Sequence, residues 1–245
     1  GLSISDLPVL MIKYGERDTP VIPGSTWKGV FRSRVESYLV ASGKKACGGP
    51  GDTCGDRIGK QMESLLKRPS EESRRKVLEI LSSELCLACK IFGAPHYSSK
   101  ILFSDSYPTG GFSIGRKPGI AIDRRSGSVR RGALYNVDFI EPGAVFSFRF
   151  VAKNLPNYAL GLIAKVIIEV NEGLVKIGGF KTRGFGRVKL VNLRHTVDRG
   201  MEKNMLKGFT EREKIWYDEM DEDVEFDGTT EGLMRSLASL ADKWL

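Results

Sequence analysis

The segment GGFKTRGFGRVKL, residues 178–190, places cationic and aromatic side chains between glycines. Glycine lets a backbone approach a partner closely or take positive φ. Lys181 and Arg183 are spaced to meet a run of phosphates, and Phe180 or Phe185 can stack on a base. No GxxxxGK[ST] motif of the P-loop type occurs in the chain. The segment predicts contact with nucleic acid, and the alternative is a glycine-rich turn with solvated charges between a helix and a strand.

Four cysteines form a second pattern that is typical of a metal site: Cys47, Cys54, Cys86 and Cys89. Six residues of a glycine-rich stretch separate the first pair, and the second pair is a CxxC. Zinc favours four thiolates in a tetrahedron, and an intracellular protein rarely keeps disulfides. We therefore expect a structural zinc site, with His96 in place of one cysteine as an open alternative. Scattered free cysteines are the other reading; a redox CxxC is disfavoured because Cys86 is expected at a helix end.

A second group of cations lies between Gly115 and Tyr135. Its members are Arg116, Lys117, Arg124, Arg125, Arg130 and Arg131. Turn-forming residues at Ser126 and Gly127 separate two stretches that mix arginines with apolar residues, which predicts a protruding hairpin with cationic sides. In a basic domain such an arm is typical of nucleic-acid binding, and the alternative is a solvated, disordered loop.

The charge of the 245-residue chain is unevenly distributed around its net value of +8. From Asp198 to Leu245 there are 13 acidic and 7 basic residues, a net of −6, so the upstream part carries 31 basic and 17 acidic residues, a net of +14. A domain with this much positive charge attracts polyanions such as nucleic acids. Membrane surfaces and acidic proteins would attract it as well. No apolar run approaches the ~18 to 20 residues of a bilayer span, and no signal-peptide pattern opens the chain.

The elements that must position these residues follow an α+β pattern. We expect helices at residues 26–43 (with Ser25 as N-cap), from residue 69 onward, and at 157–172, 211–220 and 231–244; strands are expected at 101–104, 145–151 and 188–193. Two helix-containing units, each followed by strands, fit two RRM-like or ferredoxin-like halves better than a doubly wound parallel sheet.

Three motifs in order resemble the RAMP superfamily, the repeat-associated CRISPR proteins. IPGSTWKGVFRSRVE is similar to its helix motif I-P-G-S-S-x-K-G-x-x-R, GIAIDRRSGSVRRGALYNVDFIEPGAVF to its thumb hairpin, and GGFKTRGFGRVKL to its glycine-rich loop. With the similar motif at Asp6 that is described below, they extend from Asp6 to Leu190, and they look most like the backbone subunit of type III CRISPR effector complexes. In that family an N-terminal strand precedes the region where this sequence starts, so we expect residues before Gly1.

The resemblance implies a RAMP fold on a βαββαβ core. We expect that domain at residues 1–195, with insertions at about 44–100, a thumb at about 110–140, and an acidic helical segment at 196–245.

The resemblance also implies roles for particular residues. Ser5-Asp6-Leu7-Pro8-Val9 is similar to the family's D-x-P-V motif, whose aspartate cuts target RNA, so Asp6 is the candidate catalytic residue and would hold magnesium or another divalent metal. Asp18 has similar flanks. RNA contacts are implied for Ser25, Lys28 and Arg32, which share one face of a helix, and for the thumb arginines.

The implied function is a guide-RNA-binding backbone subunit of an antiviral type III CRISPR ribonucleoprotein complex that cleaves complementary target RNA. Its partners would be guide RNA, target RNA, copies of itself and other subunits, without a membrane, in the cytoplasm. The alternatives are a non-catalytic RNA-binding subunit of the same kind, and a stand-alone CRISPR RNA-processing endoribonuclease. For the last, His96 and His195 are the candidate catalytic residues, because such enzymes use a histidine and no metal.

Overall fold

The computed structural model describes residues 5–245 except residues 50, 68, 199 and 210–220. For residues 130–133 it describes the backbone and not the side chains. The chain forms two compact units. Unit 1 contains Gly1–Thr26 and Ser104–Arg149, and unit 2 contains Trp27–Phe103 and Phe150–Leu245. The expected α+β class is confirmed, because helices combine with small antiparallel sheets of two or three strands in the described residues.

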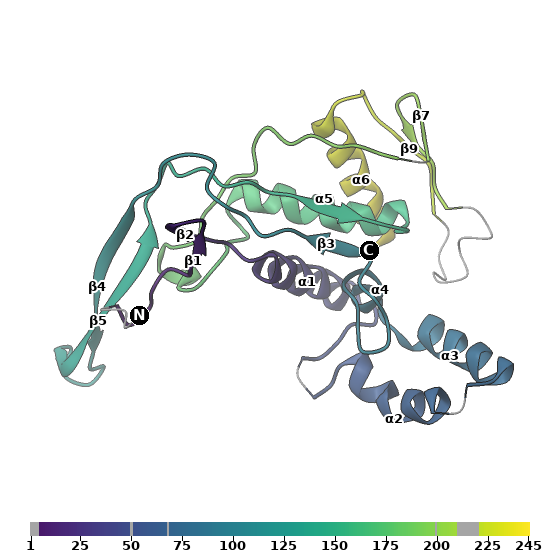
Figure 1. Cartoon of the computed structure of the whole chain (residues 1–245), viewed down its shortest axis with the longest axis horizontal. Helices are drawn as coiled ribbons and strands as arrows, with labels where there is room; N and C mark the ends of the chain where they lie inside the picture. Colours follow the sequence, from purple (N-terminus) through teal and green to yellow (C-terminus); the bar gives the residue numbers. More distant parts are fainter. Residues whose placement is uncertain (1–4, 50, 68, 199, 210–220) are drawn as a thin grey trace. The chain divides into compact units, whose positions relative to one another are not determined.

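Two antiparallel hairpins make up the regular structure of unit 1. The first joins β1 (Met11–Tyr14) to β2 (Arg17–Pro20). The second is the basic hairpin, β4 (Ile114–Ile122) and β5 (Val129–Ile140), which is drawn as the long two-stranded ribbon of Figure 1. Its register changes between Ile120 and Ile122, where one strand carries an irregularity. The hairpin predicted around Ser126 and Gly127 is therefore present.

Two helices and a pair of short strands form the centre of unit 2. α1 (Gly24–Ala41) begins in unit 1 and continues here, and α5 (Asn157–Glu172) has the bounds that its sequence predicts. β3 (Ile101–Phe103) pairs antiparallel with β6 (Phe150–Ala152). Aromatic rings join the helix to the strands, because Phe103 packs against both Phe31, at 5.0 Å between centroids, and Phe150, at 5.7 Å. Phe31 and most of the aliphatic side chains of α5 are buried and supply the core.

Three helices lie between α1 and β3 in unit 2: α2 (Cys54–Leu66), α3 (Glu71–Glu84) and α4 (Leu87–Phe92). α3 begins where the sequence predicts, with Ser70 as N-cap. α2 was not expected, since its start lies in a glycine-rich stretch. Thr53 and Asp56 form a capping box there, which supplies the orphan N–H groups of the first turn with acceptors.

The C-terminal residues add a helix and a small sheet to unit 2. β7 (Met201–Glu202), β8 (Met205–Leu206) and β9 (Val224–Glu225) form the sheet, and α6 (Thr230–Trp244) packs along α5 (Figure 1). Gly161 of α5 permits this approach, because a Cβ there would lie 2.8 Å from the Cβ of Ala241 and closer still to the carbonyl of Leu237. The helix predicted at 231–244 is present, and the one at 211–220 lies outside the described residues.

Three local expectations are wrong. The strand expected at 145–151 is regular only over β6, with an isolated bridge at Phe146 before it. Ser25 is the second residue of α1 rather than its N-cap, and the N–H of Gly24 donates instead to the carboxylate of Asp105 at 2.7 Å. Residues 188–193 form no strand, because the backbone N–H and C=O of Leu190 bond to the side chain of Asn171 at 2.7 and 3.1 Å. None of the helices in the described residues is both long and apolar enough to cross a membrane.

Candidate functional site

Four cysteine sulfurs converge in unit 2, all from residues between α1 and β3. From the Sγ of Cys47 the distances to those of Cys54, Cys86 and Cys89 are 3.7, 3.8 and 3.4 Å, and all four sulfurs lie within 4.8 Å of one another. A tetrahedral site with Zn–S bonds of about 2.3 Å requires sulfurs about 3.8 Å apart. The spacing therefore fits one ion with four thiolate ligands, and the cluster can hold a metal ion such as zinc.

Local structure explains how residues so far apart in sequence meet. Cys54 is the first residue of α2, and Cys86 is the N-cap of α4 with Cys89 one turn later. Backbone N–H groups at these helix starts point at sulfur: the N–H of Cys54 lies 3.4 Å from the Sγ of Cys47, and the N–H of Cys86 lies 3.3 Å from the Sγ of Cys54. These groups stabilise negative charge on sulfur. Cys86 thus opens a helix, but one that follows α3 rather than a strand.

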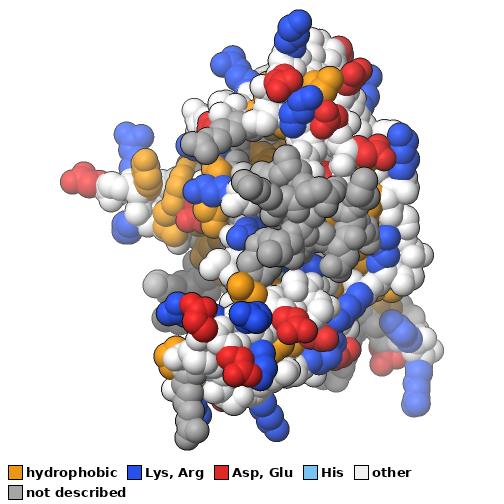
Figure 2. All heavy atoms as spheres, turned by 90° about the vertical axis from the view of Figure 1, so that its right-hand side faces the viewer, with side chains coloured by type: hydrophobic (Ala, Val, Ile, Leu, Met, Phe, Trp, Pro, Cys, Tyr) orange, Lys and Arg blue, Asp and Glu red, His pale blue; other side chains and the backbone are white. Residues whose placement is uncertain are grey.

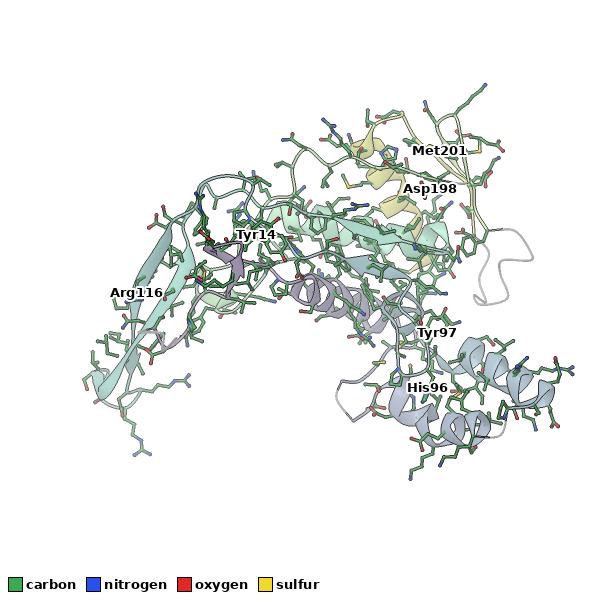
Figure 3. All side chains as sticks on the ribbon, viewed as in Figure 1. Tyr14, His96, Tyr97, Arg116, Asp198 and Met201 are labelled. Atoms are coloured by element: carbon green, nitrogen blue, oxygen red, sulfur yellow. The ribbon has the colours of Figure 1, made fainter. Side chains whose placement is uncertain are left out.

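The proximity of the thiols couples their protonation. Hydrogen bonds from Cys86 and Cys89 lower the pKa of Cys54, whereas hydrogen bonding to Cys54 raises the pKa of Cys86 to about 12. Four thiolates therefore do not coexist without a cation. Among the described residues the cluster contains no histidine, and His96 lies exposed in the turn after α4, beside Tyr97 (Figure 3). The alternative with three cysteines and His96 is not supported.

The three predicted RNA contacts of α1 have different surroundings. Ser25 is exposed in the first turn, and Lys28 is half-buried one turn later. The backbone N–H of Gly24, at the N-terminus of α1, already donates to Asp105. Arg32 is directed at the protein itself, because its Nη1 donates to the carbonyl of Gly93 at 2.9 Å and its Nη2 to the Sγ of Cys89 at 3.3 Å.

The glycine loop, residues 178–186, presents cations to solvent. Lys181–Arg183 forms one 3₁₀ turn, and both end residues of that turn are exposed. The loop is closed at its base by the N–H of Ile177, which donates to the carbonyl of Gly186 at 2.9 Å. Gly186 has φ +80°, and a Cβ built on it would clash with the carbonyl oxygen of Ile177, so only glycine fits there.

The two phenylalanines of the glycine loop contact each other. Phe180 and Phe185 meet edge to face with centroids 6.4 Å apart, and the guanidinium of Arg183 lies 4.6 Å from the centroid of Phe180. The cation and the aromatic ring therefore form one surface, on which a planar base and its phosphate can both find a partner.

The tip of the basic hairpin combines cations with apolar side chains. Arg124 and Arg125 are exposed in its turn, which the carboxylate of Asp123 stabilises by accepting two backbone N–H bonds. Ile120 and Leu134, which face each other across the strands, are 50% and 66% exposed. The side chains of Arg130 and Arg131 lie outside the described residues. Arg116, further from the tip, pairs with Asp138 at 2.7 Å and 3.3 Å (Figure 3).

Asp6 lies beside β5 near the middle of the same hairpin, where Asn136 pairs with Pro118. One oxygen of its exposed carboxylate accepts the backbone N–H of Asn136 at 2.8 Å. The next residue, Leu7, extends along β5 in a parallel bridge to Val137, which anchors the segment. Asp18 differs, because it pairs with Lys13 across β1 and β2 at 3.2 Å. Among the described residues the four cysteines form the one group of ligands close enough for a metal, so a cation at Asp6 would need oxygens from water or RNA.

Two groups near these sites were not singled out from the sequence. Arg57 donates from its Nη2 to the Sγ of Cys54 at 3.2 Å, and its position three residues after that cysteine on α2 was the available signal. Asp105 gives no comparable signal, because it follows a short strand 81 residues from the helix start that it caps. On the face drawn in Figure 2, the coloured Lys and Arg side chains are interspersed with those of Asp and Glu.

Comparison with known proteins agrees with these features. The family model of the RAMP superfamily matches residues 8–189, which include α1, the cysteine cluster, the basic hairpin and the glycine loop. Asp6 lies just before the matched residues. A search of curated proteins finds no match to the chain. Since the family model covers well over half of the 245 residues, the chain belongs to the RAMP superfamily of CRISPR-associated RNA-binding proteins.

Proposed function

We propose that this protein is a backbone subunit of a type III CRISPR effector complex, where it binds guide RNA and cleaves complementary target RNA. The observation that carries the proposal is the family match over residues 8–189, within which the glycine loop holds Lys181 and Arg183 exposed on a closed turn. In the complex the protein would contact copies of itself, other subunits and both RNAs, and it would serve antiviral defence.

The guide would be bound through its phosphates. Lys181 and Arg183 are exposed on one turn of 3₁₀ helix. Ser25 and Lys28 lie about one turn apart on α1. A subunit that repeats along a variable guide must bind every sequence, and phosphate contacts carry no sequence information. The edge-to-face pair in the glycine loop adds a surface for stacking, which is also tolerant of sequence.

The basic hairpin would act on the guide–target duplex. Arg124 and Arg125 would approach its phosphates, and Arg130 and Arg131 are proposed to join them. The exposed apolar residues Ile120 and Leu134 favour a role in which the hairpin presses against the duplex and distorts it, since apolar side chains pack against unstacked bases.

Asp6 is proposed as the catalytic residue. Its carboxylate would hold a divalent cation such as magnesium, with oxygens of water and of the scissile phosphate as the other ligands. The hydrogen bond from Asn136 orients the carboxylate and leaves its second oxygen for the ion. Magnesium commonly binds through one or two carboxylates and the phosphates of its substrate, so a single aspartate is compatible with this role.

Zinc is proposed at Cys47, Cys54, Cys86 and Cys89, where it would be structural. Four thiolates would complete the tetrahedral coordination of the ion and leave no open position for a substrate, as in structural zinc sites. Its role would be to hold α2 and α4 in place, because each contributes a ligand at its N-terminus.

A stand-alone processing enzyme that uses a histidine has less support. The Nδ1 of His195 lies 2.9 Å from the hydroxyl of Thr230, and its ring packs edge to face on Phe226, so α6 already engages it. His96 is exposed in a tight turn with φ +65°. A binding-only subunit keeps all the RNA contacts and lacks only cleavage at Asp6.

The test is an assay of the purified complex with labelled complementary RNA. We expect guide binding that is similar for unrelated guide sequences and that weakens steeply with salt, and target cleavage that requires a divalent cation. Tight target binding without cleavage would favour the binding-only subunit. Cleavage that survives a chelator would favour the metal-independent processing enzyme, and guide affinity that depends on sequence would contradict phosphate recognition.

A further inference from the structure

The guanidinium of Arg32 has a partner at each of its three nitrogens. Nε donates to the carboxylate of Glu36 at 2.8 Å, Nη1 to the carbonyl of Gly93 at 2.9 Å, and Nη2 to the Sγ of Cys89 at 3.3 Å. The side chain is 27% exposed. Arg32 therefore connects α1 to α4, since Cys89 lies within that helix and Gly93 is its C-cap.

A second guanidinium reaches the cysteine cluster from another helix. Arg57 of α2 donates from Nη2 to the Sγ of Cys54 at 3.2 Å and from Nη1 to the carboxylate of Asp52 at 2.7 Å. Two arginines that are 25 positions apart thus use the same pattern, in which a carboxylate holds one side of the guanidinium and a cysteine sulfur accepts from the other. The repetition of this pattern at two sulfurs argues against an accidental contact.

The negative charge of the metal-bound site explains what these arginine contacts contribute. Four thiolates and one divalent cation carry a formal charge of −2, and three of the four cysteines are buried. Net negative charge on partly buried sulfurs needs compensation, because little water reaches it. N–H groups that donate to the ligand sulfurs supply that compensation. Arginine suits the role because its planar group stays charged and can bond several acceptors at fixed angles.

We propose that Arg32 and Arg57 are positioning residues of the metal centre, which orient the sulfurs of Cys89 and Cys54 and strengthen metal binding. The inference rests on the proposed metal site and assigns Arg32 a role other than RNA contact. The contacts of Arg32 also link the metal site to α1, on which Arg32 lies one turn after Lys28. Metal loading would thereby fix α1 against α4.

The experiment measures metal binding by the full chain. Zn²⁺ affinity is obtained by competition with a chromophoric chelator, and the geometry of the sulfurs is followed by the charge-transfer absorption of the Co²⁺-substituted protein. For Arg57→Ala and Arg32→Ala we expect about 10- to 100-fold weaker Zn²⁺ binding and a shifted Co²⁺ band, as for other residues that contact metal ligands. Arg32→Lys should lose about 10-fold, because one ammonium cannot serve three partners.

Matched controls come from the same helices. Arg34→Lys makes the same change two residues along α1, where the arginine pairs with Glu169, and Lys60→Ala removes a cation one turn after Arg57 on α2. Both should keep the Zn²⁺ affinity and the Co²⁺ band of the wild type. Since Arg57 lies in an exposed part of α2, its variant decides the question if Arg32→Ala does not fold.

Unchanged metal affinity and an unchanged Co²⁺ band in the Arg32 and Arg57 variants would overturn the proposal. Weaker RNA binding by Arg32→Lys with normal metal binding would return Arg32 to the RNA interface and overturn it as well. A wild-type chain that binds no Zn²⁺ would overturn the metal centre itself, a separate result that leaves the proposed RNA function standing.

Discussion

The carboxylate of Asp105 accepts the backbone N–H of Gly24 at 2.7 Å, so the N-terminus of α1 already faces an anion. A helix N-terminus is a favourable site for phosphate, and the motif that begins this helix invites that reading. Here a side chain from the segment after β3 takes that place. RNA bound along α1 would depend on side chains such as Lys28 rather than on this N–H group.

Replacement of Asp105 tests that distinction. Asp105→Ala should lower the free energy of unfolding by about 1 kcal/mol, as the loss of a helix cap does. RNA affinity should stay the same or increase, because a negative charge near the helix start is removed. Thermal unfolding and a filter-binding titration measure the two effects. A clear loss of RNA affinity in a folded variant would show that Asp105 orders part of the RNA site.

Removal of two cations from the glycine loop should weaken RNA binding. The double change Lys181→Ala with Arg183→Ala should reduce affinity for unrelated guide sequences by a similar factor and flatten the dependence of binding on salt, because phosphate contacts release counterions. Lys60→Ala with Arg75→Ala removes the same charge from α2 and α3 and is the control. Equal losses in both double variants would indicate an effect of net charge alone.

Asp6→Asn should abolish target cleavage and preserve target binding. The amide oxygen can still accept the N–H of Asn136, so the local structure is kept while the charge that would hold a divalent ion is lost. Asp18→Asn is the control, since it only breaks an exposed ion pair with Lys13, which contributes little. Gel analysis of labelled RNA with magnesium measures both. Normal cutting by the Asp6 variant would place the catalytic residue elsewhere.

Removal of the proposed zinc should destabilise the fold of unit 2. We expect about one zinc ion per chain by elemental analysis, and a lower melting temperature after chelation or in Cys86→Ser, because metal binding contributes to folding. Ser82→Ala in α3 is the control. Protein without zinc whose melting temperature does not change on chelation would contradict the assignment.

A methyl group at Gly161 should separate α5 from α6. Gly161→Ala would place a Cβ 2.8 Å from that of Ala241, so we expect a loss of about 1–3 kcal/mol as for other overpacked cores. Gly29→Ala in α1 is the matched control: nothing lies within 4 Å of its Cβ position, and alanine there should stabilise by up to about 1 kcal/mol. Equal melting temperatures for the two variants would contradict this packing.

Local sequence signals predicted the elements whose contacts are themselves local. α5 has its predicted bounds because an apolar helical period follows Pro156 and ends at Gly173, which takes the left-handed conformation with φ +81°. The basic hairpin follows from turn residues between two strand-forming stretches. The start of α2 could have been predicted too, since Thr53 and Asp56 have the spacing of a capping box.

Contacts between distant residues decided what the sequence did not predict. Leu190 has the apolar pattern of a strand, but the amide of Asn171, 19 residues earlier, bonds both of its backbone groups and takes the place of a neighbouring strand. Likewise the period of α1 puts Arg32 on the face of Lys28, and nothing in that period indicates a sulfur 57 residues away as its partner.

The backbone closure of the glycine loop has a consequence for protein engineering. The backbone hydrogen bond from Ile177 to Gly186 holds the two ends of the loop together whatever side chains stand between them. The entropy lost when the loop closes is therefore already offset by the fold. The side chains of residues 181–183 can therefore be replaced while the loop stays closed. New cations, aromatic rings or a reactive group for cross-linking can be grafted there while Gly186 is retained, and the rest of unit 2 should not have to adjust.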